Sequence, residues 1–445
     1  MNSTTPKPND RLANVFALVF GAFLGLALLK FGNPCILEKL VDRPTNALEW
    51  LLNPWPVKSS PAWVFTFIIS ILAAVIALKL DITKPRPVVF WSVLSWYLWQ
   101  LLFAGTHTVD SELTKATTRH FMLCSFCFAV GLDLLPRARS LAPFFLCLLA
   151  ALVVVMAVGW QQHFGGLADT RKYFYAYIYP TLPSVPPEML KKISSDRIYG
   201  TLFYPNALAG ALLLLTPVSL ALVWSWRERL TAGARGLLMA LLGTGALGCL
   251  YWSKSKGGWL LALVLGLVAL TRAQFSRRVK MILVSAILVV GLASFALRFA
   301  EYFEKGATSV SARGDYWRAA WQTACANPLY GTGPGTFAIP YAKIKNPESE
   351  MARLVHNDYL QQASDSGFIG AAAYLAFIVG SLWLTWRNLA REDWLKFSVW
   401  LGLLGWSLQS CVEFGLYIPS LAWPAFALFG WLLGSSRVAA DARRL

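Results

Sequence analysis

The sequence predicts an all-α integral membrane protein with about 12 transmembrane helices. Hydrophobic residues make up 56% of its 445 residues, and they fall into repeated apolar blocks whose length suits a helix that crosses a bilayer. The blocks lack the alternation of apolar and polar residues that is typical of strands. Two polar connections, about 161–205 and about 300–366, are much longer than the others. We therefore expect a helical bundle with two long loops on one side of the bilayer, the larger loop being helical and capping a site.

The apolar blocks give the predicted spans in chain order. The first block, Ala13 to Lys30, lacks the short apolar core and the small-residue cleavage site of a signal peptide, so we expect it to be a retained span. The block at 257–271 is the shortest. The predicted spans lie near residues 13–30, 61–78, 88–104, 120–135, 141–160, 206–224, 235–252, 257–271, 279–299, 367–386, 395–413 and 417–434.

The formal net charge of +17 is distributed in a way that indicates topology. Lysine and arginine gather in short connections such as 79–86, 272–280 and 387–396, and short cation-rich connections face the cytoplasm in most membrane proteins. An even number of spans then returns both termini to the cytoplasmic side. The positive charge therefore does not call for a nucleic acid partner.

The two long loops then face outward, and loops of this length are usually functional or disordered. No Asp-x-Asp pair and no histidine cluster at metal-ligand spacing occurs in the outer segments, so the sequence predicts a reaction without a metal or another cofactor. The seven cysteines are an odd number with mostly apolar neighbours, which argues against a disulfide framework. All four histidines fall in the outer segments or at their membrane edge: His107, His120, His163 and His356.

The second long loop contains three motifs in a fixed order. They are Arg313-Gly-Asp-Tyr-Trp-Arg318, then Asn327-Pro-Leu-Tyr-Gly331-Thr-Gly333-Pro-Gly335, then His356-Asn357-Asp358-Tyr359-Leu360. Two weaker similarities lie upstream, where Arg197 to Asn206 lead into the sixth span and Ser255-Lys256-Gly257-Gly258 open the eighth. In order and spacing, residues 197–370 resemble the O-antigen ligase and polymerase superfamily. We accordingly divide the chain into N-terminal membrane helices (1–196), this ligase-related core (197–370) and C-terminal membrane helices with a tail (371–445).

The resemblance implies a function. Members of the superfamily transfer a glycan from a polyprenyl (undecaprenyl) diphosphate carrier to an acceptor hydroxyl, on the periplasmic face of the bacterial inner membrane. The acceptor is a lipid A core sugar for ligases, a growing glycan for polymerases, and a protein serine or threonine for the related oligosaccharyltransferases. The motif pattern favours a ligase, and the other two acceptors remain open. The partners expected are thus the lipid-linked donor, one of these acceptors and the bilayer, with no nucleic acid.

The motif residues suit displacement at an anomeric carbon, which needs a base for the hydroxyl and positive charge for the departing diphosphate. Histidine has an ordinary pKa of about 6.5, so His356 suits the general base of a metal-independent, inverting transfer. Asn357 is expected to orient His356 or the sugar. Arg197 corresponds to the family's diphosphate-binding arginine, and its planar fork can contact two phosphate oxygens.

Other residues complete the predicted site. Lys256 stands where the family pattern usually has arginine. Lys256, the nearby Lys254 or both are expected to face the diphosphate. Arg313 is expected to contact phosphate or to brace the loop. The supporting residues are predicted to be Asn206, Gly331, Gly333 and Gln161.

Simpler interpretations exist for the same residues. His356 suits a helix cap, and Arg197 and Lys256 suit the headgroup level of a span end. The glycines from 331 to 335 favour a tight turn over a phosphate-binding loop, because they do not follow a strand. Glu413, one turn after Gln409, is costly in an apolar helix and is therefore a candidate for a polar cavity.

Two other functions fit twelve spans. A flippase for lipid-linked glycans would place its polar groups near the middle of the membrane, whereas here they gather in outer loops. A non-catalytic assembly partner would use the loop only to bind glycan, so that no single residue of the motifs would be essential for transfer.

Overall fold

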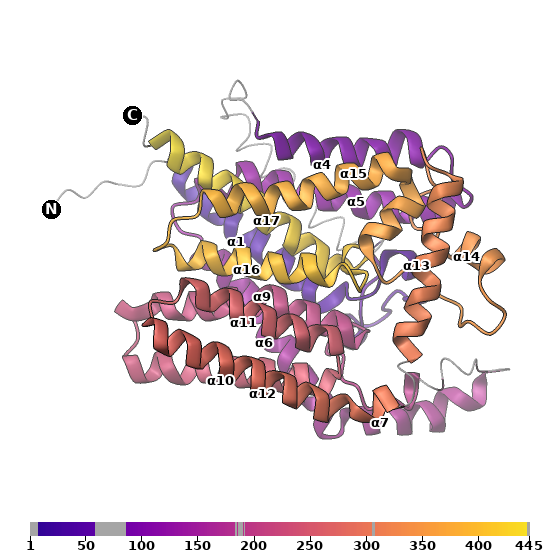
Figure 1. Cartoon of the computed structure of the whole chain (residues 1–445), viewed down its shortest axis with the longest axis horizontal. Coiled ribbons are helices and arrows are strands. Elements are labelled where there is room, and N and C mark those ends of the chain that lie inside the picture. Colours follow the sequence, from indigo (N-terminus) through magenta and orange to yellow (C-terminus); the bar gives the residue numbers. More distant parts are fainter. Residues whose placement is uncertain are drawn as a thin grey trace.

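The computed structural model describes residues 8–57, 86–182, 185, 190, 192–304 and 308–442. Within these ranges the chain forms helices and no strand. Long helices run side by side in one bundle, and α13 (Thr308–Ala326) crosses one end of that bundle (Figure 1). The start of α1 (Pro8–Lys30) and the end of α17 (Pro419–Ala442) lie at the other end (Figure 1).

The remaining elements follow in chain order. The helices are α2 (Ala47–Leu52), α4 (Val88–Trp99), α5 (Ser111–Asp133), α6 (Ala142–Gln161), α7 (Leu167–Tyr173), α9 (Pro205–Ser225), α10 (Ala232–Ser253), α11 (Lys256–Arg272), α12 (Arg277–Glu304), α14 (Ala338–Ile344), α15 (Asp358–Arg387) and α16 (Trp394–Gln409). The short helical turns are η1 (Cys35–Leu40), η2 (Gln100–Ala104), η3 (Leu135–Arg137), η4 (Gln162–Gly166), η5 (Phe174–Ile178), η6 (Tyr179–Thr181), η7 (Trp226–Glu228) and η8 (Gly415–Tyr417).

Seven helices among the described residues are long and apolar enough to cross a membrane, which confirms the predicted helical membrane fold in outline. These seven contain α1, α5, α6, α9, α10, α12 and α15. The span predicted at 61–78 lies outside the described residues, and the other predicted spans coincide with helices that are not among the seven. The total of twelve therefore stays a prediction.

Glycines allow the central helices to pack closely. A Cβ atom on Gly131 of α5 would lie 2.2 Å from the carbonyl oxygen of Ala427 in α17, and one on Gly430 of α17 would lie 2.1 Å from that of Phe128 in α5. Small residues of this kind let backbones approach each other, which is how helices associate in membranes where burial from water gives little driving force. This contact fixes α17, and with it the turn between α16 and α17 that contributes to the site.

Three predicted span boundaries differ from the helices observed. The helix predicted to begin at residue 367 begins at Asp358, and its helical backbone is interrupted at Gly367, where φ is +69°. The span predicted over 395–413 ends as a helix at Gln409, so residues 410–414 form a turn. Hydropathy marks apolar residues rather than helix ends, and Phe414 in this turn is buried by packing.

The third boundary concerns His120, which the sequence placed at the outer edge of a span. The helix α5 begins earlier, at Ser111, after the N-cap Asp110. His120 is fully buried, its Nε2 lies 2.7 Å from the carbonyl oxygen of Leu416, and its Nδ1 accepts a hydrogen bond from Trp423 Nε1 at 3.2 Å. His120 is therefore a packing residue.

Candidate active site

His356 is held in an unusual backbone conformation immediately before α15. Its φ is +55°, a left-handed conformation that costs a non-glycine residue roughly 1–3 kcal/mol. The next residue, Asn357, is the N-cap of the helix, and its Oδ1 accepts a hydrogen bond from the Leu360 N–H at 3.0 Å. The Trp317 indole of α13 donates to the His356 carbonyl oxygen at 3.4 Å. The cap and α13 thus hold the turn that presents the imidazole.

The imidazole ring is enclosed by aromatic side chains and one carboxylate. Its centroid lies 6.0 Å from that of Tyr316 in a stacked arrangement and 4.7 Å from that of Phe414 in an edge-on one. Its Nδ1 lies 3.1 Å from Oε2 of Glu413. With 29% of its side chain exposed, His356 remains accessible to a substrate.

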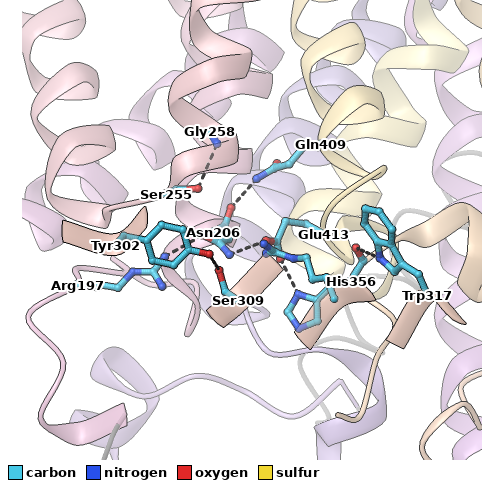
Figure 2. Close-up of polar contacts among 11 residues, drawn as sticks. Arg197, Asn206, Ser255, Gly258, Tyr302, Ser309, Trp317, His356, Gln409 and Glu413 are labelled. Atoms are coloured by element: carbon cyan, nitrogen blue, oxygen red, sulfur yellow. Dashed lines mark hydrogen bonds and ion pairs between the residues drawn. The ribbon is translucent and has the colours of Figure 1, made fainter. Parts of the chain in front are cut away.

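Glu413 connects the polar residues of the site (Figure 2). Besides His356, its carboxylate accepts a hydrogen bond on Oε1 from Asn206 Nδ2 at 2.5 Å and forms an ion pair with Arg313. Gln409 supports this arrangement by donating to the Asn206 carbonyl oxygen at 2.7 Å. Helices α9, α13 and α16 and the start of α15 therefore converge on one carboxylate.

The electrostatics of the site keep Glu413 charged. Burial raises the pKa of this carboxyl, but the charge and hydrogen bond of His356 and the charges of Arg313 and Arg197 outweigh burial, so its pKa lies below the ordinary value. An ionised carboxylate only accepts hydrogen bonds, so Nδ1 of His356 must carry the proton in their contact. Whenever the ring is neutral, its lone pair therefore lies on Nε2, as a general base requires.

Arg197 is anchored within the same cluster. Its Nε donates to the carbonyl oxygen of Ser253, at the end of α10, and its terminal nitrogen donates to Oδ1 of Asn206, each at 2.8 Å. Burial lowers the pKa of this guanidinium, Glu413 raises it and Arg313 lowers it. Asn206 thus bridges Arg197 and Glu413 (Figure 2).

Lys256 adds a third cation. It opens α11 directly after the N-cap Ser255, and its ammonium lies 3.6 Å from the ring centroid of Tyr302, a cation–π contact. Burial, followed by the charges of Arg197 and Arg313, lowers the pKa of Lys256 to about 8. The other predicted lysine, Lys254, ends α10 with a φ of +51° and forms no ion pair with any residue that the structure describes.

The glycine motif of the long loop forms a tight turn. The φ angles of Gly331, Gly333 and Gly335 are +67°, +107° and +78°, values that glycine adopts without strain. The Gly333 N–H donates to the carbonyl oxygen of Asp365 at 2.8 Å, and the Gly335 N–H donates to its carboxylate at the same distance. These glycines therefore join the loop to α15, away from the polar cluster around Glu413.

Gln162 holds the segment that leads to Arg197, whereas the predicted supporting residue was its neighbour Gln161. Gln162 is buried, accepts hydrogen bonds from the N–H groups of Tyr199 and Gly200 at 3.0 and 2.8 Å, and donates to the Gly200 carbonyl oxygen at 2.9 Å. Gln161 is exposed. The sequence shows two adjacent glutamines, and only the helix phase distinguishes the inward one.

An apolar cleft of about 810 Å³ lies within the helical bundle. It runs between α9, α10, α11 and α16, and Leu250 of α10 lines it. The carbonyl oxygen of Leu250 accepts a hydrogen bond from the hydroxyl of Ser253, the residue whose backbone binds Arg197. Along α10 the cleft therefore reaches to about one helical turn from Ser253, the residue that binds Arg197. Further lining residues include Leu213, Gly243, Leu265 and Phe397.

The structure brings most of the predicted site residues together. Asn206, Arg313 and His356 contact Glu413 directly, and Arg197 is joined to it through Asn206. Lys256 lies within electrostatic reach of the two arginines. The sequence singled out Glu413 for a polar cavity, but not as the partner of His356. The sequence shows Glu413 only as a carboxylate near a glutamine in an apolar stretch. That pattern indicates a polar site but does not identify His356 as the partner of Glu413.

Comparison with known proteins assigns a family to part of the chain. A family model described as O-antigen ligase matches residues 238–375. The matched segment includes Lys256, Arg313 and His356 and ends within α15. No curated protein matches the chain significantly.

Proposed function

The chain belongs to the O-antigen ligase superfamily, and on this premise we propose that it transfers a glycan from a polyprenyl diphosphate carrier to an acceptor hydroxyl. A role in glycan transfer within a membrane is what the family match supports. The observation that carries the more specific proposal is the contact of His356 Nδ1 with the buried Glu413 carboxylate, which leaves Nε2 as the basic nitrogen.

In the proposed reaction His356 is the general base. The acceptor hydroxyl oxygen attacks the anomeric carbon, the bond from that carbon to the diphosphate oxygen breaks, and the hydroxyl proton passes to Nε2. Glu413 stabilises the resulting imidazolium at Nδ1, as a carboxylate does in other histidine-based sites. A single displacement of this kind inverts the anomeric configuration.

The donor's diphosphate is assigned to Arg197 and Lys256. Both are cations beside the polar cluster, and Arg197 keeps one terminal nitrogen for which the described residues provide no hydrogen bond. The two charges act in place of a metal ion on the leaving diphosphate. Arg313 is the less direct candidate, because its guanidinium is already paired with Glu413, so bracing the loop is its proposed role.

The apolar cleft supports a lipid-linked donor. A diphosphate held by Arg197 would place the first isoprene units near Leu250, and the lining residues beyond it are almost all apolar. Inside a membrane the prenyl chain would be held by close packing against these apolar side chains, because burial from water gives little driving force there. The cleft thus lies where the proposed reaction needs a site for the carrier lipid.

We assign the site to the periplasmic face of the inner membrane, with both termini in the cytoplasm and lipid A core as the acceptor. A growing glycan or a protein hydroxyl is the alternative acceptor within the superfamily.

The test uses the purified full chain in nanodiscs with a polyprenyl-diphosphate glycan, with chelator present, and separately with lipid A core, glycan and peptide acceptors. We expect transfer with inversion to one of the three acceptors. Failure of transfer to all three, together with movement of the carrier across vesicles that contain the protein, would contradict the proposal and support a flippase.

A further inference from the structure

Asp358 is a fully buried carboxyl group in the first turn of α15, two residues after His356. Its main-chain N–H donates to the carbonyl oxygen of Ser410 at 2.8 Å, and its side-chain Oδ2 accepts from the Leu416 N–H at 2.9 Å. Ser410 and Leu416 are the two ends of the segment whose middle residue is Glu413. We refer to residues 410–416 as the carboxylate turn.

We propose that Asp358 is a positioning residue that holds the carboxylate turn so that Glu413 meets Nδ1 of His356. The proposal rests on the function proposed above and assigns Asp358 no contact with substrate. The reason is that Asp358 binds both ends of the carboxylate turn and is also joined along the chain, through Asn357, to His356. Asp358 thus fixes the positions of His356 and Glu413 relative to each other.

Neighbouring contacts also join the start of α15 to the segment that carries Glu413. The hydroxyl of Tyr359, the next residue, donates to the carbonyl oxygen of Ser407 in α16 at 2.9 Å. Phe414, next to Glu413, packs edge-on against the His356 ring. The start of α15 is therefore joined to α16 at Ser407 and to the carboxylate turn at Ser410 and Leu416.

The proposal separates Asp358 from the other buried aspartate of α15. Asp365 is equally inaccessible, but its carboxylate accepts hydrogen bonds from the Gly335 N–H and the Tyr417 hydroxyl, at 2.8 and 3.0 Å. Asp365 therefore binds the glycine turn and a residue beyond Leu416. Asp365→Ala is the matched control for loss of a buried carboxylate outside the carboxylate turn.

The test compares Asp358→Ala, Asp358→Asn and Asp365→Ala in the full chain, labelled with ¹⁵N-histidine. The His356 signals, assigned by their absence in His356→Ala, report which ring nitrogen carries the proton, independently of any activity. We expect Asp358→Ala to lose the Nδ1–H form that Glu413 selects and Asp358→Asn to keep it, because the amide oxygen still accepts from Leu416. Asp365→Ala is expected to keep it as well.

Transfer rates give the second readout. Asp358→Ala is expected to lower kcat by about 10²-fold with little change in KM for the donor, because a misplaced Glu413 affects the chemical step. It should also move the pH profile of kcat, because His356 then faces Arg313 and Tyr316 without the compensating carboxylate. Asp358→Asn should restore both values.

If Asp358→Ala does not fold, Asp358→Glu replaces it, since glutamate keeps the acceptor but lengthens the side chain and displaces the turn. A wild-type His356 tautomer and pH profile in the folded alanine or glutamate variant would overturn the proposal. If the wild type transfers no glycan, the proposed function fails, while the tautomer measurement still decides the role of Asp358.

Discussion

Glu413→Gln tests the charge on which the site depends, with almost no change in side-chain shape. In the wild type Oε1 accepts from two donors, Asn206 and Arg313, whereas Oε2 faces the single Nδ1 of His356. The amide oxygen of glutamine is therefore expected to take the Oε1 position, which turns the NH₂ group toward Nδ1. A donor at Nδ1 moves the ring proton to Nε2, so the base loses its lone pair.

The size of this effect follows from the role of the lost group. General base catalysis contributes typically 10²–10⁴-fold to the rate, so we expect kcat to fall by about that factor, or about 3–5 kcal/mol of activation free energy. KM for the donor should change less, because Arg197 and Lys256 remain. The assay is the initial rate of glycan transfer as a function of pH and donor concentration.

The matched control is Glu112→Gln, which neutralises an exposed glutamate that pairs with Lys115 on the surface of α5. The control should transfer glycan at the wild-type rate. If Glu413→Gln kept a rate within about threefold of wild type, less than the lower bound for a general base, and an unchanged pH profile, the assigned tautomer would be refuted.

Three further predictions concern the cation, the cleft and the loop. With its pKa lowered to about 8, Lys256 is positively charged below that pH and neutral above it, so kcat/KM for the donor should fall as the pH rises through about 8. Lys256→Met should flatten this fall. An unchanged pH profile in the variant would argue against a contact of Lys256 with phosphate. Gly243→Leu should fill open space in the cleft and force the prenyl chain to repack, at a cost of about 1–3 kcal/mol. It should therefore lower kcat/KM about tenfold for a long-chain donor but not for a short-chain one. Gly236→Leu, on the same helix with equal space but outside the cleft, is its control, and equal effects of both changes on both donors would contradict the assignment. Gly367→Ala should destabilise the fold by about 2–4 kcal/mol, because a Cβ there would lie 2.2 Å from the Leu329 carbonyl oxygen at a φ of +69°. Thermal unfolding followed by circular dichroism measures this loss of stability. An unchanged unfolding midpoint would contradict the prediction.

Much of the fold was predictable because a bilayer imposes a simple rule on sequence. Apolar blocks of sufficient length must be helical, since no water is present to satisfy the backbone. The ends of the helices were less predictable. The turn at 410–414 contains Val412, which hydropathy counts with the span 395–413. Hydrogen bonds with Asp358, donated to Ser410 and accepted from Leu416, hold this segment as a turn.

The candidate site was predictable where a residue type has few other uses. A histidine and two cations in outer loops have specific chemistry, and their motif order indicated one family. The partnership of Glu413 with His356 was not predictable, because it depends on how two helix ends meet in space. Likewise, only the helix phase decides that Gln162 rather than Gln161 faces inward.

The most direct test of the account is the rate of glycan transfer by purified His356→Ala compared with the wild type, under one donor and acceptor and without added metal. We expect transfer by the wild type and a loss of at least about 10²-fold in kcat in the variant, with thermal stability and donor binding retained through Arg197 and Lys256. Transfer by the folded variant at the wild-type rate would contradict the assignment of His356 as the base.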